Sequence, residues 1–316
     1  MDTHELLQKI TSLPIAAAGL SEELLAGNFS SIFKGQGMEF DEARHYQAGD
    51  DVRSIDWNAS ARFGTPFVKM YREEKELTIM ILLDISASMH RGTFTRHRSG
   101  GGAGGLSPYE QGLIAAALIA FSAESTGQRV GALFFDRGIE RVFPPRKGRH
   151  HIMALVCGGL QYQKTKAVPG QSRELGSNIC AVLSGAGRML KRRSLIAVIS
   201  DFYSINWEEE MGNLCRRHDV IALRISDPLE NDLPDMGLIR MEDSETGLRM
   251  EAPTGLNSFQ DAWSQWHKER SELWTSQCRR CGAAHLELST ASDASGVLLK
   301  FFGSRQRGQT GYRERA

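Results

Sequence analysis

The chain has 316 residues, of which 41% are hydrophobic, and its 38 Lys and Arg residues balance 38 Asp and Glu residues to a net charge of zero. This length suggests roughly two domains, or one large α/β unit, with enough apolar residues for a hydrophobic core. A neutral balance argues against a broad electrostatic surface for nucleic acid or for an anionic membrane.

The start of the chain, MDTHELLQKI, has neither the basic region nor the apolar region of a secretory signal. The longest apolar run, LIAAALIAF at residues 113–121, is too short to cross a bilayer. The five cysteines are an odd number and are not typical of a disulfide framework. We therefore expect a cytoplasmic protein with no membrane span.

Residues 1–76 predict an N-terminal subdomain of mixed structure, with a helical start followed by short segments and glycine turn signals. The stretch GDDVRSIDW at residues 49–57 gathers acidic residues around Arg53. We interpret it as a structural cluster in which Arg53 and Arg62 pair with the acids and Trp57 packs inward. Partner recognition is the second interpretation, and a carboxylate catalytic site is less favoured.

From residue 77 the chain alternates strand-like and helix-like segments. The strand-like runs show little alternation of apolar and polar residues, which is typical of parallel strands buried on both faces. They lie at residues 78–83, 129–135, 194–200 and 219–225. Two further segments, 133–143 and 239–253, predict hairpins.

Helices are predicted between these strands. Ser107, Pro108 and Glu110 form a capping sequence for a helix to about residue 124 that is apolar nearly all round. The other predicted helices span residues 179–193, 206–218 and 256–281. The pattern predicts an α/β fold over residues 77–303, with a doubly wound, mostly parallel sheet and helices on both faces. Residues 304–316 are predicted to be a disordered tail.

The stretch LTIMILLDISASMH at residues 77–90 ends an apolar run with a carboxylate and two hydroxyls. Asp84, Ser86 and Ser88 follow at spacings of two, so a loop can direct their oxygens toward one point. In open α/β sheets, ligands bind beyond the carboxyl ends of the strands. Carboxylate and hydroxyl oxygens suit Mg²⁺ or Mn²⁺, and the sequence therefore predicts a site for a divalent cation here.

Other polar side chains are expected at the same edge of the sheet. Asp201 ends the next buried strand, and Ser177 and Asn178 stand just before a predicted helix. Both Ser177 and Asn178 are also ordinary helix N-caps, and the two roles, ligand and cap, stay open.

This pattern resembles the metal-ion-dependent adhesion site of von Willebrand factor A domains. With the preceding run YQAGDDVRSIDWNASARFGTPFVKMYREEKE at residues 46–76, the chain resembles the bacterial family named domain of unknown function 58. The resemblance implies Mg²⁺ (or Mn²⁺) held directly by hydroxyls such as Ser86 and Ser88, with Asp84 and Asp201 acting largely through water and Ser177 supplying the hydroxyl of the second loop. One coordination position would stay open for an acidic residue of a partner. Where the adhesion site usually has Thr followed by Asp in the second loop, this chain has Ser177 followed by Asn178.

The function expected from this resemblance is a non-enzymatic, metal-dependent protein-binding module. Its expected partner is a MoxR-type AAA+ ATPase, with the protein acting as adaptor or co-chaperone. The alternative is a Mg²⁺-dependent phosphohydrolase that uses Asp84 as nucleophile, although Ser86 stands where such enzymes need a second Asp as general acid. A third hypothesis is a structural domain whose metal site has been lost.

The sequence offers one further candidate metal site. The pair Cys278 and Cys281 could combine with Cys215 and His218 into a zinc set, but both pairs stand at predicted helix ends with nothing in the sequence to bring them together.

Overall fold

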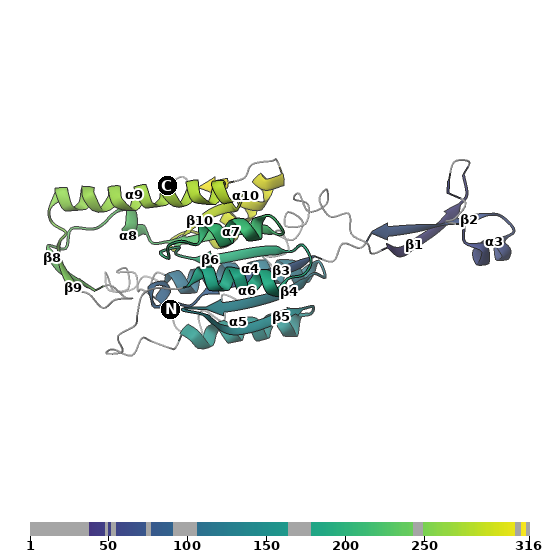
Figure 1. Ribbon diagram of the computed structural model, residues 1–316, viewed down its shortest axis with the longest axis horizontal. Coiled ribbons are helices and arrows are strands. Elements are labelled where there is room, and N and C mark those ends of the chain that lie inside the picture. The colour runs from purple at the N-terminus through teal and green to yellow at the C-terminus, as the bar shows by residue number, and fades with distance from the viewer. Residues whose placement is uncertain are drawn as a thin grey trace. The chain divides into compact units, whose positions relative to one another are not determined.

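The computed structural model describes residues 38–47, 50–51, 55–73, 77–90, 106–163, 178–242, 249–306 and 311–313. The chain divides into two compact units, and the described residues before 74 belong to one and those from Leu77 onward to the other. Figure 1 shows the elements of both units.

The larger unit is built on a sheet of seven strands in the order β11-β10-β7-β6-β3-β4-β5. In chain order these strands are β3 (Thr78–Asp84), β4 (Arg129–Phe135), β5 (Ile139–Arg146), β6 (Leu195–Ser200), β7 (Asp219–Ser226), β10 (Ala284–Ser289) and β11 (Gly311–Arg313). Neighbouring strands are parallel except for the antiparallel pair β4 and β5. The predicted mostly parallel sheet is therefore confirmed, as is the hairpin that adds an antiparallel edge.

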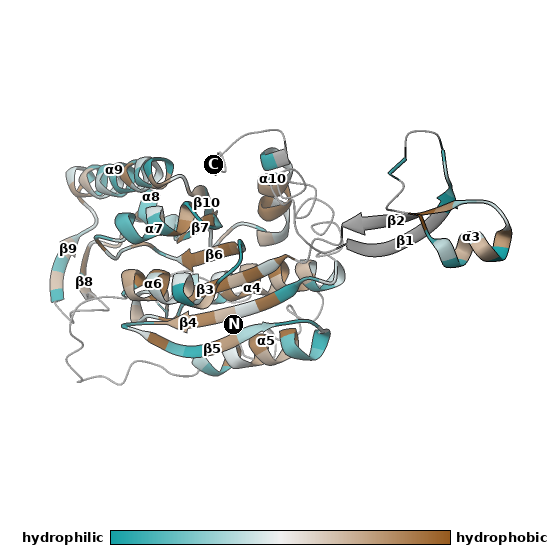
Figure 2. Cartoon of the chain, turned by 45° about the vertical axis from the view of Figure 1, so that its right-hand side comes forward, coloured by the Kyte–Doolittle hydropathy of each residue, from teal (hydrophilic) through white to brown (hydrophobic). Residues whose placement is uncertain are grey.

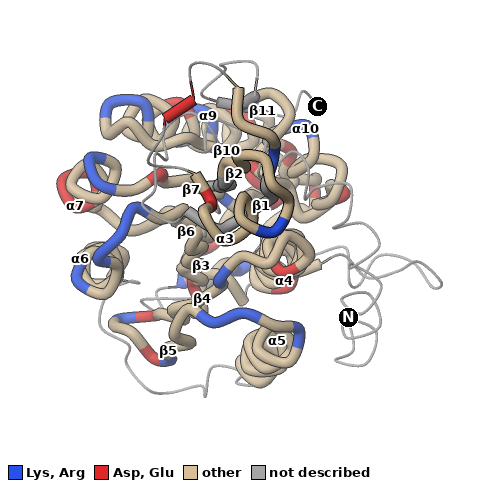
Figure 3. Tube along the Cα trace, turned by 90° about the vertical axis from the view of Figure 1, so that its right-hand side faces the viewer, with Lys and Arg blue, Asp and Glu red and all other residues tan. Residues whose placement is uncertain are grey.

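Helices cover both faces of this sheet. They are α4 (Pro108–Ser125), α5 (Arg149–Gln163), α6 (Ile179–Met189), α7 (Glu208–Cys215), α8 (Pro228–Asn231), α9 (Asn257–Cys281) and α10 (Ala294–Gln306), and η2 (Ala87–His90) is a short 3₁₀ helix. Figure 3 shows α4, α5 and α10 on one side of the sheet and α6, α7 and α9 on the other. The doubly wound α/β fold is thus confirmed. None of the described helices combines the length and the apolar composition that crossing a bilayer requires.

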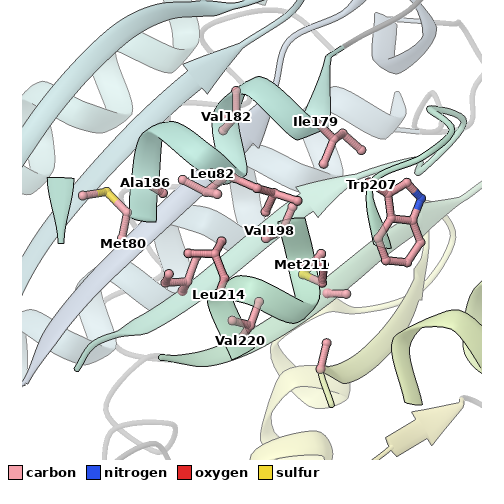
Figure 4. Close-up of a cluster of buried hydrophobic side chains, with 14 of the residues drawn as sticks. Met80, Leu82, Ile179, Val182, Ala186, Val198, Trp207, Met211, Leu214 and Val220 are labelled. Carbon is pink, nitrogen blue, oxygen red and sulfur yellow. The ribbon is translucent and has the colours of Figure 1, made fainter. Parts of the chain in front are cut away.

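The central strands form the middle of the core. Every residue of β6 is buried, and so is every residue of β3 after Thr78, which explains why their sequences do not alternate. Figure 2 shows the apolar character of β4 and β6 beside the more polar edge strand β5. Figure 4 shows one side of this core, where Met80, Leu82 and Val198 of the sheet meet side chains of α6 and α7.

Helix α4 lies against the centre of the sheet, which explains its buried, nearly all-apolar surface. It begins at the predicted capping box, in which the Glu110 N–H donates to Ser107 Oγ at 3.2 Å and the Ser107 N–H donates to Glu110 Oε2 at 2.8 Å. At Gly112 the helix comes so close to β6 that a Cβ atom would stand 3.1 Å from Ile199 Cγ2.

The edge strand β5 differs from the strands inside the sheet. Its side chains are mostly exposed or half-buried, and it contains Pro144 and Pro145. Proline lacks an N–H group, so these two residues donate no ladder hydrogen bond, and such residues are found at sheet edges.

The C-terminal end of the larger unit differs from the predicted boundary at residue 303. Helix α10 continues to Gln306, and residues 311–313 pair in parallel with β10 as the short strand β11. The helix is held past residue 303 because Arg305 Nη2 donates to both carboxylate oxygens of Asp219, at 2.9 and 2.8 Å. The predicted second hairpin is present as β8 (Leu238–Glu242) and β9 (Arg249–Pro253), which form a separate antiparallel pair.

The smaller unit contains an antiparallel pair, β1 (Met38–His45) and β2 (Phe67–Glu73), with the helix α3 (Trp57–Phe63) between them in the chain. Asp56 caps α3 by accepting from two backbone N–H groups, and Arg44 forms an ion pair of 2.6 Å with Asp50. The acidic residues of this segment therefore have structural contacts. Arg53 lies outside the described residues.

The prediction that Trp57 packs inward was wrong. Its side chain is 68% exposed, and that of Phe63 at the other end of α3 is 69% exposed. The helix meets β2 through Ser60, whose Oγ accepts from the Phe67 N–H at 2.8 Å, and this contact leaves Trp57 on the solvent side.

Because Trp57 is exposed, Trp57→Ala is expected to change the free energy of unfolding by less than about 0.5 kcal/mol. Val68→Ala, at a position 4% exposed in the same unit, is the control and is expected to cost about 2 kcal/mol. Urea unfolding followed by far-UV circular dichroism measures both. A loss at Trp57→Ala equal to that of the control would contradict the exposed position.

Candidate functional site

The candidate site begins at the carboxyl end of β3. Asp84 is the last residue of this strand, and Asp84, Ser86 and Ser88 are all at most 2% exposed. The Ser86 N–H donates to Asp84 Oδ1 at 2.9 Å, and the Ser86 and Ser88 hydroxyl oxygens lie 2.9 Å apart. The loop therefore folds back on the strand end and brings one carboxylate and two hydroxyls together.

The end of β6 completes this arrangement. The Ser200 hydroxyl donates to Asp84 Oδ2 at 2.6 Å, which joins the ends of the two parallel strands. The next residue, Asp201, is 2% exposed, and its Oδ1 accepts from the Tyr203 N–H at 3.1 Å. Of the residues that the sequence singled out, Asp84, Ser86, Ser88 and Asp201 thus lie at one edge of the sheet.

Ser200 was missed by the sequence reasoning. It bridges the two loops, because its hydroxyl donates to Asp84 Oδ2 and its oxygen accepts from the Phe202 N–H at 3.0 Å. A hydroxyl residue directly before Asp201, at the last position of an otherwise apolar strand, was the available signal.

The environment of Asp84 is unfavourable for a lone negative charge. Burial, and then the charge of Asp201, raise the pKa of Asp84 from 3.8 to about 7, although hydrogen bonds from Ser200 and Ser86 oppose this. A positive ion beside the pair would offset both causes of the shift. The buried carboxylates and hydroxyls therefore form a set of hard oxygen atoms suited to a divalent cation.

The second predicted loop is only partly described. Ser177 lies outside the described residues. Asn178 caps α6, since its Oδ1 accepts from the Ala181 N–H at 3.0 Å, and its own N–H donates to the Asp136 carbonyl at 2.8 Å. Of the two roles considered for Asn178, metal ligand and helix cap, the structure thus shows the helix cap.

The backbone after Asp201 is strained. Phe202 has φ of 54°, in the left-handed region, which costs a residue other than glycine about 1 to 3 kcal/mol. Its buried ring packs on Trp207 and Trp274, with centroids 5.5 and 5.6 Å away. The strained turn is therefore held by the core beneath it.

The zinc hypothesis receives no support from the described residues. Burial raises the pKa of Cys215 to about 12, and it also raises the pKa values of Cys278 and Cys281. Within the described part of the chain, no three or more His, Cys, Asp and Glu side chains are grouped to hold a metal.

Several known proteins are similar to this chain. Uncharacterized proteins of Mycobacterium tuberculosis and Mycobacterium bovis are each 28% identical to it over 309 residues, which cover 98% of this chain and 92% of theirs.

Among solved structures, proximal thread matrix protein 1 from the mussel byssus matches 48% of this chain and 38% of its own, with 16% identity and a TM-score of 0.31. An uncharacterized membrane spanning protein from Vibrio fischeri matches 73% of this chain and 98% of its own, with 12% identity and a TM-score of 0.25. Residues 42–272 match the family described as Protein of unknown function DUF58, and the chain therefore belongs to this family.

Proposed function

We propose that this protein is a non-enzymatic protein-binding module that depends on Mg²⁺ or Mn²⁺. Its site would be a metal-ion-dependent adhesion site of the von Willebrand factor A type. The observation that carries the proposal is the buried group of Asp84, Ser86, Ser88 and Asp201, in which the pKa of Asp84 is raised to about 7. A cation would supply the positive charge that this carboxylate pair needs.

In this proposal each residue has a defined part. The hydroxyls of Ser86 and Ser88 would bind the ion, and Asp84 and Asp201 would hold its water ligands and balance its charge. Ser200 orients Asp84 through their hydrogen bond of 2.6 Å. The ion would offer its remaining position to an acidic side chain of a partner protein.

A partner class follows from the family resemblance. We propose a cytoplasmic MoxR-type AAA+ ATPase as the protein that donates this acidic residue, with the present chain acting as its adaptor or co-chaperone.

The phosphohydrolase alternative fits the site less well. Both oxygens of Asp84 already accept hydrogen bonds, from the Ser86 N–H and from Ser200 Oγ, and Ser86 cannot serve as a carboxylic general acid. Phosphoester hydrolysis in the presence of Mg²⁺, lost in Asp84→Asn, would favour the enzyme over the binding module.

Metal binding is expected to stabilise the protein by mass action. At a Mg²⁺ concentration one hundred times Kd, the gain of about 2.7 kcal/mol corresponds to a rise in Tm of about 5 to 10 °C. Thermal melting with EDTA, with Mg²⁺ or Mn²⁺, and with NaCl at equal ionic strength measures this effect. A Tm that rises by the same amount with NaCl, or that does not rise with any of the salts, would count against a metal site. It would favour a domain that has lost its metal site.

A further inference from the structure

Arg270 of α9 contacts the loop that follows β6. Its Nη2 donates to the Phe202 carbonyl at 3.1 Å, and its guanidinium carbon lies 3.9 Å from the centroid of the Tyr203 ring. These are the two residues directly after Asp201, so a side chain from a distant part of the chain touches the turn that carries this residue of the candidate site.

The turn has defined contacts at each step. The Phe202 N–H donates to Ser200 Oγ at 3.0 Å, and the Tyr203 N–H donates to Asp201 Oδ1 at 3.1 Å. Phe202 is left-handed, with φ of 54°, which directs its carbonyl to Arg270. If that hydrogen bond is lost, the strained residue can relax, and the Tyr203 N–H that holds the Asp201 carboxylate moves with it.

A second group of charges fixes the other side of Tyr203. The Tyr203 hydroxyl lies 3.5 Å from Glu230 Oε1, and Glu230 Oε2 forms an ion pair of 2.7 Å with the buried Arg224. Tyr203 is thus held between Arg270 and Glu230. Burial lowers the pKa of Arg270, while the negative charges of Asp201 and Glu230 oppose this, so the guanidinium lies within electrostatic reach of the site.

We propose that Arg270 is a positioning residue of the metal site, which acts through Phe202 and Tyr203 to keep Asp201 in place. This inference rests on the proposed metal binding and adds that α9 sets the affinity of the ion. Arginine suits the role because its planar group can stack on a ring and donate a hydrogen bond at once, which lysine cannot do.

The test compares the Mg²⁺ and Mn²⁺ affinities of three variants of the full chain by isothermal titration calorimetry. Arg270→Met is expected to bind at least about tenfold more weakly, as is typical when a residue that supports a metal ligand is removed. Arg270→Lys, which can donate to the carbonyl without stacking, is expected to lie between this variant and the wild type. The matched control is Arg305→Met, which removes the arginine that pairs with Asp219 at the amino end of β7, and it is expected to keep wild-type affinity.

Each outcome decides a separate point. Wild-type affinity in a folded Arg270→Met, or an equal loss in Arg305→Met, overturns the positioning role and leaves the metal site standing. Absence of binding in the wild type overturns the proposed function itself. If Arg270→Met does not fold, Arg270→Lys decides, and wild-type affinity in that variant counts against the inference.

Discussion

Asp84→Asn is expected to abolish Mg²⁺ binding and, at the same time, to make the metal-free protein more stable near pH 8. Burial and the neighbouring Asp201 raise the pKa of Asp84 to about 7, so the ionised carboxylate weakens the folded state. Asparagine removes this charge and can still accept from the Ser86 N–H. The gain in the free energy of unfolding is expected to be on the order of 2 to 4 kcal/mol, from about 1.4 kcal/mol per pKa unit.

The sign of this effect gives a pH test. The folded pKa of Asp84 is higher than the unfolded value of 3.8, so the contribution of protonated Asp84 to stability is fully present below about pH 4. It is lost as the pH rises from there through about 7, because the unfolded state releases its proton first. Urea unfolding in EDTA should therefore show a steeper loss of stability between about pH 4 and pH 7 in the wild type than in Asp84→Asn.

A divalent cation should raise the free energy of unfolding of the wild type at about pH 8 and leave that of Asp84→Asn unchanged, because the metal neutralises the same charge. Equal pH profiles for the two proteins would show that burial does not raise the pKa of Asp84. Equal metal affinities in calorimetry would show that Asp84 is not part of a metal site.

Arg224→Met is expected to produce a large loss of stability in the larger unit. Arg224 is 2% exposed and pairs with Glu230 at 2.7 Å and with Glu287 at 3.3 Å. Removal of one partner from a buried ion pair leaves a charge without compensation and costs about 3 to 5 kcal/mol. Urea unfolding at neutral pH measures the change.

Two matched variants show whether uncompensated charge is the cause. Adding Glu230→Gln and Glu287→Gln to Arg224→Met should recover part of the loss of stability, because neutral amides replace the two carboxylates that paired with Arg224. Arg305→Met breaks a less buried pair, with side chains 15% and 22% exposed, and should cost less than Arg224→Met. A cost below about 1 kcal/mol for Arg224→Met would mean that the two glutamates are solvated by water or pair with another cation in the variant.

The sequence contained enough to predict the sheet, its hairpin edge and the capped helix at Ser107, because these depend on local patterns of apolar residues and caps. It also placed Asp84 and Asp201 at one edge, since parallel strands end together. Arg270 could not be found in this way. Nothing local distinguishes it from the other basic residues of α9, and only the packing of that helix brings it to Phe202.

The prediction that Trp57 packs inward was wrong for a related reason. Indole side chains are usually buried in a core, but α3 is too short to have one, and none of its residues is buried. The tryptophans of α9 divide in the same way: Trp274 is 4% exposed in the core, while Trp266 is 50% exposed. Helical spacing alone did not separate these two positions.

The prolines of β5 bear on how the protein can meet other chains. Edge strands with free N–H groups can recruit an extended segment of another molecule, which leads to strand exchange or aggregation. Pro144 and Pro145 leave fewer N–H donors along this border, and the exposed charge of Glu140 further discourages a close neighbour. This border is therefore a poor template for β-augmentation. We expect any recognition of another chain to use side-chain contacts elsewhere on the surface.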